Sequence, residues 1–197
     1  MTKYSPVNFN IPELKGISRK TIEGHIKLYE GYVKHTNLIY EKIEEYMKDS
    51  EKHAYALGEL QRRFSFEWNG MRNHEYYFKS LEGGPTPLAD GALKKAIEAE
   101  FGSFDAWLQM FKAIALTRGI GWAMLYYDTE EKKLVHAWVD EQHLGQLNSA
   151  QLVLGLDMWE HAFLLDYIPS EKKKYAEAFF ENLNWGVIEE NFEKASR

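Results

Sequence analysis

Hydrophobic positions in the first half of the chain recur at three- and four-residue intervals, as they do on one face of a helix. Ser18 precedes the pattern and has the side chain of a helix N-cap. Asp49 and Ser50 interrupt the pattern, and a second helical pattern runs over residues 51–81. Two helices with a short join predict an antiparallel hairpin, preceded by an extended arm. The first helix presents Ile22, His25, Tyr29, Tyr32, Val33, Ile39, Tyr40 and Ile43 on its apolar face.

A cluster of chain breakers separates this hairpin from the rest of the chain. The segment "EGGPTPLADG", residues 82–91, contains paired glycines and two prolines, which are typical of a boundary between structural units. We therefore predict an N-terminal helical hairpin domain over residues 1–86 and a C-terminal α/β domain over residues 87–197.

The second half begins with helical patterns and then changes period. "FGSF", residues 101–104, predicts a helix stop followed by a serine N-cap. The segments "GWAMLYYD" (121–128) and "KLVHAWVD" (133–140) predict a β-hairpin, and "AQLVLGLD" (150–157) predicts a third, buried strand. Helical patterns then return, with Ser170 as an expected cap. The fold class is α+β: a helical hairpin followed by an α/β domain with a small three-stranded antiparallel sheet.

Composition narrows the function. The 197 residues have a formal net charge of -6 and no cysteine, so disulfides, thiolate metal sites and cysteine nucleophiles are excluded. The negative charge argues against nucleic-acid or acidic-membrane partners, and an anionic substrate would need a local positive field. We find neither a secretory signal nor an apolar run long enough to cross a membrane. A cytoplasmic protein is the default expectation.

Four polar residues fall on surfaces that are otherwise apolar, namely His25, His74, Asp157 and His161. Each alone fits a hydrogen-bonded core residue or, for His161, an ion pair with Glu160. Buried together without a cation, they would be several unfavourable polar groups in one core. Three imidazoles and a carboxylate form a nitrogen and oxygen set suited to iron or manganese, and ligand type alone does not exclude zinc.

The motif "DMWEHAF", with Asn184 and Trp185 downstream, closely resembles the signature of the iron/manganese superoxide dismutase family. "NHEYYF" resembles the family's second-helix motif, "GIGWAML" its β-hairpin start and "FGSF" its inter-helix joint. The order and spacing match from about Phe9 to Phe192. The resemblance implies disproportionation of superoxide at one iron or manganese ion per subunit.

The resemblance also implies roles for individual residues. The metal ligands would be His25, His74, Asp157 and His161. Tyr32 would be the gateway tyrosine, and Tyr29 would replace a family histidine that lines the substrate funnel. A hydrogen-bond donor to the metal-bound solvent is needed; Gly70 has no side chain to serve, so His143 is predicted, with Gln142 as the alternative. A dry aromatic shell is expected from Trp122, Trp159, Tyr77 and Phe78, for which ordinary core packing is the compatible alternative.

In this family, a glutamate at the position of Glu160 reaches across a dimer interface. It binds the ligand histidine of the other subunit, which corresponds to His161 here. The resemblance therefore implies a homodimer, and a tetramer stays open. Two tyrosines usual in the family are replaced here by Phe163 and Leu164.

The family's funnel arginine has no clear equivalent, because the loop reads "IPSEKKKY". The arginine would be replaced by a lysine, namely Lys172, Lys173 or Lys174. The alternative is that these three lysines form a solvated helix face. These departures motivate an alternative function, a metal-binding protein of this fold with weak or lost dismutase activity; a structural helical protein without metal is a third. The sequence leaves iron against manganese open: Gly70 favours the manganese type, whereas "LDMWEHAF" and His143 resemble iron-dependent members.

Overall fold

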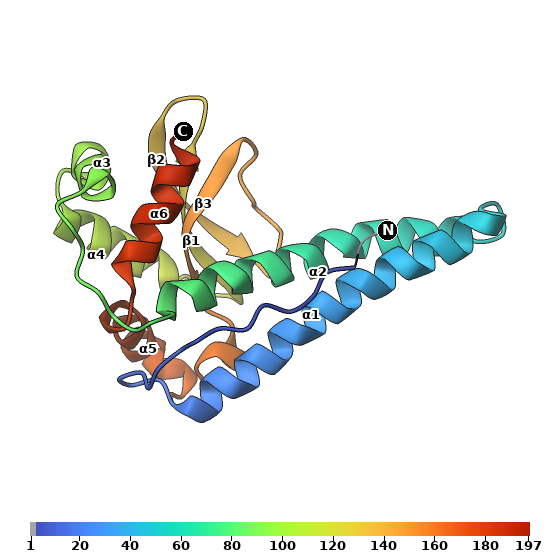
Figure 1. Ribbon diagram of the computed structural model, residues 1–197, viewed down its shortest axis with the longest axis horizontal. Helices are drawn as coiled ribbons and strands as arrows, with labels where there is room; N and C mark the ends of the chain where they lie inside the picture. Colours follow the sequence, from blue (N-terminus) through green and yellow to red (C-terminus); the bar gives the residue numbers. More distant parts are fainter. Residues whose placement is uncertain (1–2) are drawn as a thin grey trace.

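The helical hairpin predicted for the N-terminal half is confirmed. A computed structural model describes residues 3–197, with α1 at Arg19–Tyr46 and α2 at Ala54–Leu81 joined through a short 3-10 turn, Met47–Asp49. The two helices run antiparallel and project as a long arm from the rest of the molecule (Figure 1). Ser18 caps α1 as predicted, because its side chain accepts the Thr21 N–H.

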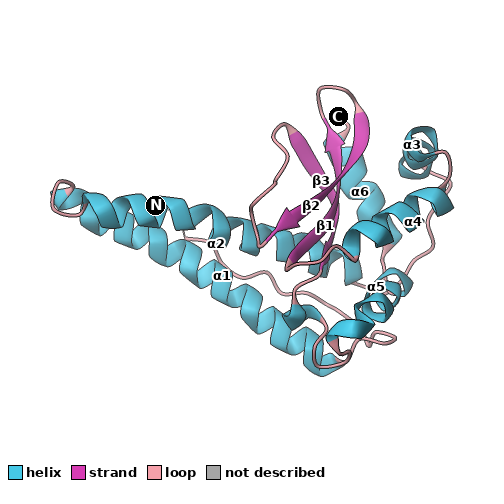
Figure 2. Ribbon diagram, turned by 180° about the vertical axis from the view of Figure 1, so that it is seen from behind, coloured by secondary structure: helices cyan, strands magenta, loops and turns pink. Residues whose placement is uncertain are grey.

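The C-terminal half contains the predicted small sheet, flanked by helices (Figure 2). The three strands are antiparallel in the order β2-β1-β3, and their bounds are those predicted. Gly102, in the left-handed region with φ 86°, ends one helix, and the Ser103 side chain caps the next. The elements are α3 (Ala92–Phe101), α4 (Phe104–Ala115), β1 (Gly121–Asp128), β2 (Lys133–Asp140), β3 (Ala150–Asp157), α5 (Lys172–Glu181) and α6 (Trp185–Ala195).

The prediction that Ser170 caps the next helix is wrong. Ser170 lies inside a 3-10 turn, Pro169–Glu171, and α5 begins after it at Lys172. Proline fixes its own φ near the helical value and favours the first position of a helical turn. Pro169 therefore starts the turn one residue before the serine.

The end of β3 lies where the two halves meet. Trp122 in β1 pairs with Asp157, the last residue of β3, and both α2 and α6 pack against this strand. Buried hydrophobic side chains from both halves form one continuous core. Asp157 is thereby held against the helical hairpin. Within residues 3–197, no helix combines the length and apolar character needed to cross a bilayer.

Candidate metal centre

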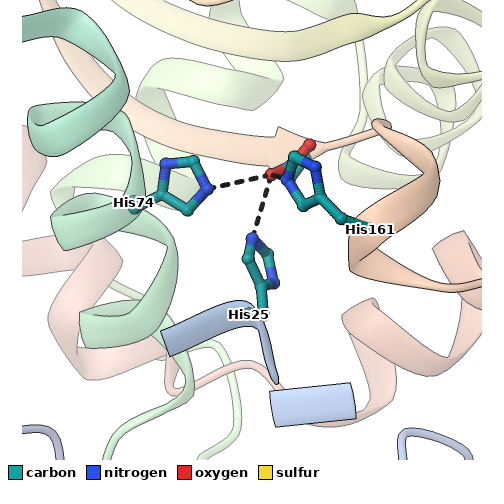
Figure 3. A group of neighbouring side chains, drawn as sticks. His25, His74 and His161 are labelled. Atoms are coloured by element: carbon teal, nitrogen blue, oxygen red, sulfur yellow. Dashed lines mark hydrogen bonds and ion pairs between the residues drawn. The ribbon is translucent and has the colours of Figure 1, made fainter. Parts of the chain in front are cut away.

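Four side chains from separate elements converge at the end of β3 (Figure 3). His25 comes from the middle of α1, His74 from α2, Asp157 from the end of β3, and His161 from the 3-10 turn Glu160–Ala162. The Oδ2 atom of Asp157 lies 3.1 Å from Nε2 of His25, 3.4 Å from Nε2 of His74 and 3.0 Å from Nε2 of His161. One potential ligand atom from each residue lies within 4.8 Å of all the others.

Three of the four side chains are fully buried and one is partly exposed. Those of His25, His74 and Asp157 are fully buried, whereas the His161 side chain is 20% exposed. Burial lowers the pKa of His25 and takes that of His74 to about 3, because a charged imidazole loses its hydration there. Burial alone would raise the pKa of Asp157, but charge and hydrogen-bond interactions with His161 and His25 lower it overall. The buried imidazoles are therefore neutral beside a carboxylate at neutral pH.

The tautomer of His74 is fixed by its surroundings. Its Nδ1 atom lies 2.6 Å from the carbonyl oxygen of Gly70. A carbonyl oxygen only accepts, so Nδ1 carries the proton and Nε2 of the neutral ring carries a lone pair. That lone pair faces the Asp157 carboxylate, and Nε2 has no hydrogen-bond partner among residues 3–197. Two buried acceptors facing each other are unfavourable without a cation. The residues present thus fit a bound metal ion.

Aromatic rings enclose the four residues. The His25 ring lies 5.0 Å from Tyr77 and 4.9 Å from Phe78, centroid to centroid. The His74 ring lies 5.1 Å from Trp122, and the His161 ring stacks 5.6 Å from Trp159. The sequence predicted these four aromatic residues around the site. They give the cluster an apolar wall, which Trp159 continues over the ring of His161.

Gln142 has a fixed orientation beside the cluster. Its side chain is fully buried, and Oε1 accepts the indole N–H of Trp122 at 3.0 Å. Because an indole N–H can only donate, the Gln142 amide nitrogen faces the other way and donates to the Tyr32 hydroxyl at 3.0 Å. The Tyr32 ring in turn lies 5.1 Å from the His74 ring. Of the two residues that the resemblance offered as donors, Gln142 is the one beside Tyr32.

His143 is the next residue along this turn. Its ring contacts Phe66 at 5.6 Å, and it lies outside the four-residue cluster. The Asn73 side chain donates to the backbone oxygen of Gln142 at 3.0 Å and so holds the turn in register. Asn73 was absent from the predicted site residues. Its position directly before His74 was the signal available for it in the sequence.

Gly70 is required because Tyr32 fills the space beside it. A Cβ atom at Gly70 would lie between 2.5 and 2.8 Å from atoms of the Tyr32 ring. Real side chains do not approach so closely. The glycine therefore lets Tyr32 pack directly on α2 against His74.

Tyr29 lies in the core, not along an open channel. Its side chain is fully buried, and its hydroxyl accepts the Val7 N–H at 2.9 Å and donates to Glu75 at 3.2 Å. Burial raises its pKa to about 12. This placement corrects the expectation that Tyr29 lines the funnel. α1 is continuous, so Tyr29 lies one turn after His25 on the same face. The Tyr29 hydroxyl connects the N-terminal segment to α2 through Val7 and Glu75.

The turn after β3 presents charged and apolar residues to solvent. Glu160 is exposed, as are Leu164 and Leu165, at 52% and 58%. Phe163 is buried against Tyr175. Of the three lysines considered, Lys172 donates to the backbone oxygen of Thr117 at 3.2 Å, with burial lowering its pKa. The other two pair with acids on their own helix turn, Lys173 with Glu177 and Lys174 with Glu171.

Comparison with known proteins decides the family. The model of the C-terminal domain of iron/manganese superoxide dismutases matches residues 89–191. The chain belongs to the iron/manganese superoxide dismutase family. It is 35% identical over 198 residues to a protein of Cupriavidus metallidurans named as an iron superoxide dismutase, an alignment that covers 99% of this chain and 98% of that protein.

Iron- and manganese-named members of the family are about equally similar to the chain. It is 35% identical to an iron superoxide dismutase of Aquifex aeolicus, over 99% of this chain and 93% of that protein. It is 36% identical to a manganese superoxide dismutase of Nocardia asteroides, over 87% of this chain and 82% of that protein. The family and its iron or manganese cofactor agree with the nitrogen and oxygen donors found here.

Proposed function

We propose that this chain is a superoxide dismutase that holds one iron or manganese ion through His25, His74, Asp157 and His161. The deciding observation is the His74 Nε2 lone pair that faces the Asp157 carboxylate in a buried site. The reaction is 2 O₂•⁻ + 2 H⁺ → O₂ + H₂O₂. When bound, the metal supplies one-electron chemistry by alternating between two oxidation states. Membership of the family supports this activity.

Tyr32 and Gln142 would handle protons in this reaction. The Tyr32 oxygen accepts from the Gln142 amide, so its own hydroxyl proton is left to donate elsewhere. An amide nitrogen carries two hydrogens, and Tyr32 uses one of those on Gln142. Trp122 fixes the orientation of the Gln142 side chain by donating to its Oε1 atom, and Asn73 holds its backbone by donating to its carbonyl oxygen. We therefore infer that Gln142 is the residue that donates a hydrogen bond into the site, and that Tyr32 is its gateway.

The enclosing aromatic side chains exclude water from the ligands. Trp122 and Tyr77 are fully buried, and Trp159 covers the His161 ring. A low local dielectric strengthens the interaction of Asp157 with any cation held between these residues. Their role in the function is thus to keep the ligand set rigid and dry.

We further infer that two copies form a homodimer across the turn that bears Glu160. The carboxylate is exposed next to the partly exposed His161, and Leu164 and Leu165 provide apolar surface beside it. In a two-fold dimer, Glu160 of each subunit would bind His161 of the other and fix its imidazole. Whether dimers pair into tetramers stays open. A cytoplasmic protein without nucleic-acid or membrane partners fits the net charge of -6.

Glu160→Ala tests the dimer. We expect weaker association in sedimentation and faster loss of metal, because both depend on the same carboxylate. A variant that stays dimeric and fully metallated at micromolar concentration contradicts this interface.

The activity is tested by loading purified protein separately with iron and with manganese. Metal per subunit is measured by mass spectrometry, and superoxide removal by pulse radiolysis. We expect one ion per subunit and fast removal in at least one metal form. Stoichiometric metal without removal in either form would instead support the alternative of a binding protein with lost activity.

A further inference from the structure

An ion pair between Arg63 and Glu67 lies near Tyr32 on α2 of the helical hairpin. The Arg63 guanidinium packs over the Phe66 ring with its carbon 3.6 Å from the ring centroid. Phe66 contacts the Tyr32 ring at 5.9 Å and the His143 ring at 5.6 Å. The Arg63 side chain is 51% exposed. A chain of ring contacts thus connects an exposed cation to the residue that adjoins His74.

Glu67 is the partner of this cation. Its carboxylate accepts from Nε of Arg63 at 2.9 Å, and its side chain is only 9% exposed. Glu67 directly follows Phe66 in α2, and Phe66 contacts the Tyr32 ring. Both charges therefore lie next to the ring that packs on Tyr32. Without Arg63, a largely buried negative charge would stand beside Tyr32.

A negative charge at that place opposes the substrate. Superoxide is an anion, and the whole chain carries a net charge of -6, so the local field at the entrance controls how often the substrate arrives. The three lysines at the start of α5 are otherwise engaged: Lys172 with Thr117, Lys173 with Glu177 and Lys174 with Glu171. Arg63 is the cation whose contacts reach Tyr32 through Phe66.

We propose that Arg63 offsets Glu67 at the entrance beside Tyr32 and thereby admits small monoanions to the metal centre. This inference rests on the proposed dismutase function. Arg63 acts at a distance through charge, so it is a specificity-determining residue and not a catalytic one. The planar guanidinium suits the position, because it stacks on Phe66 while it binds the carboxylate.

The test is a charge series at the two positions. Relative to the wild type, Arg63→Gln lowers the local charge by one and Glu67→Gln raises it by one. Azide serves as a stable monoanion, and its dissociation constant for the metal-loaded protein is measured by calorimetry. At low salt we expect azide binding about two- to fivefold weaker in Arg63→Gln and about two- to fivefold tighter in Glu67→Gln. The double variant should lie between the single variants, and 0.5 M salt should shrink the differences.

Arg62 and Glu59 provide the matched control. They form an ion pair on the same helix, with side chains 74% and 46% exposed. Arg62→Gln and Glu59→Gln make the same charge changes in a pair whose arginine does not pack over the Phe66 ring, and we expect little change in azide binding. Equal effects at both pairs would overturn the proposal, because they would reflect net charge alone. If Arg63→Gln fails to load metal, unchanged or weaker azide binding in Glu67→Gln overturns it.

Superoxide removal separates this inference from the proposed function. If wild-type protein is active, kcat/KM should follow the azide order across the series. An inactive wild type contradicts the function, whereas an active wild type with unchanged kcat/KM and azide binding in both single variants contradicts only the role of Arg63.

Discussion

Two histidine environments in this molecule differ in what surrounds the ring. His74 lies in a converging set of three imidazoles and a carboxylate. His136, on β2, stacks on Phe101 with ring centroids 4.5 Å apart, and its Nε2 atom is also buried without a partner among residues 3–197. Burial lowers the pKa of His136 to about 4, close to the value of about 3 for His74. Burial and a lowered pKa are thus shared; a facing carboxylate distinguishes the metal centre.

Removing that carboxylate should have the largest effect. Asp157→Asn keeps the shape of the side chain and deletes its charge, so we expect metal affinity and superoxide removal to fall by more than about 100-fold. His136→Phe is the control and should retain a full complement of metal. Metal content after dialysis, together with activity, measures both. Full metal occupancy in Asp157→Asn would contradict the assigned ligand set.

Removing the metal should have the next largest effect. The facing acceptors of His74 and Asp157 then lose the cation between them, and linkage predicts a loss of about 4 kcal/mol when the ion had been present at a thousandfold its dissociation constant. Thermal unfolding before and after chelation measures the difference. The same shift in His136→Phe would show that the second histidine environment takes no part in it. Identical melting temperatures with and without metal would contradict a metal ion bound between His74 and Asp157.

A smaller effect is expected from adding a methyl group next to the metal centre. Gly70→Ala must displace the Tyr32 ring, so we expect a loss of about 1–3 kcal/mol in stability and a fall of roughly tenfold in kcat/KM. Gly58, on the same helix, has open space around its Cα. Gly58→Ala should therefore be neutral or stabilise the protein by up to about 1 kcal/mol. If both variants behave alike, close packing of Tyr32 on Gly70 is not required for activity.

The smallest effect concerns pH. Because the folded pKa of His136 lies below its unfolded value of about 6.5, the unfolded chain binds the extra proton first as pH falls. The contribution of neutral His136 to stability is complete above about pH 6.5. It is lost as the pH falls from about 6.5 to about 4. Since the ring is partly solvated, we expect a loss of about 1 kcal/mol relative to His136→Phe. Denaturant unfolding of both proteins across this range measures the difference, and parallel curves would contradict it.

The sequence predicts elements well where the pattern is local. All three strands are confirmed at the predicted residues, because short apolar and aromatic runs end at clear turn residues. Ser18 and Ser103 are confirmed as caps, since each precedes its helix directly. Ser170 fails because Pro169 imposes its own turn first. Predictions from local sequence patterns are therefore correct except where two neighbouring signals compete, as at Pro169 and Ser170.

The site depends on tertiary placement, and sequence alone predicts it unevenly. The residue types pointed to a cluster of His25, His74, Asp157 and His161, and the structure brings these four together. The choice between Gln142 and His143 depends on which of two adjacent side chains the indole of Trp122 meets, and a turn after a strand leaves that open. The partner of Tyr29 was unpredictable for a related reason, because Glu75 and Val7 come from other elements.

The distance along the chain between the ligands has a consequence for folding. His25 and Asp157 are separated by 132 residues, so an ion bound to both closes a very long loop. Closing such a loop removes entropy from the unfolded ensemble, as a covalent cross-link does. This chain contains no cysteine with which to form one. The metal would then act as a cross-link between the first helix and the last strand.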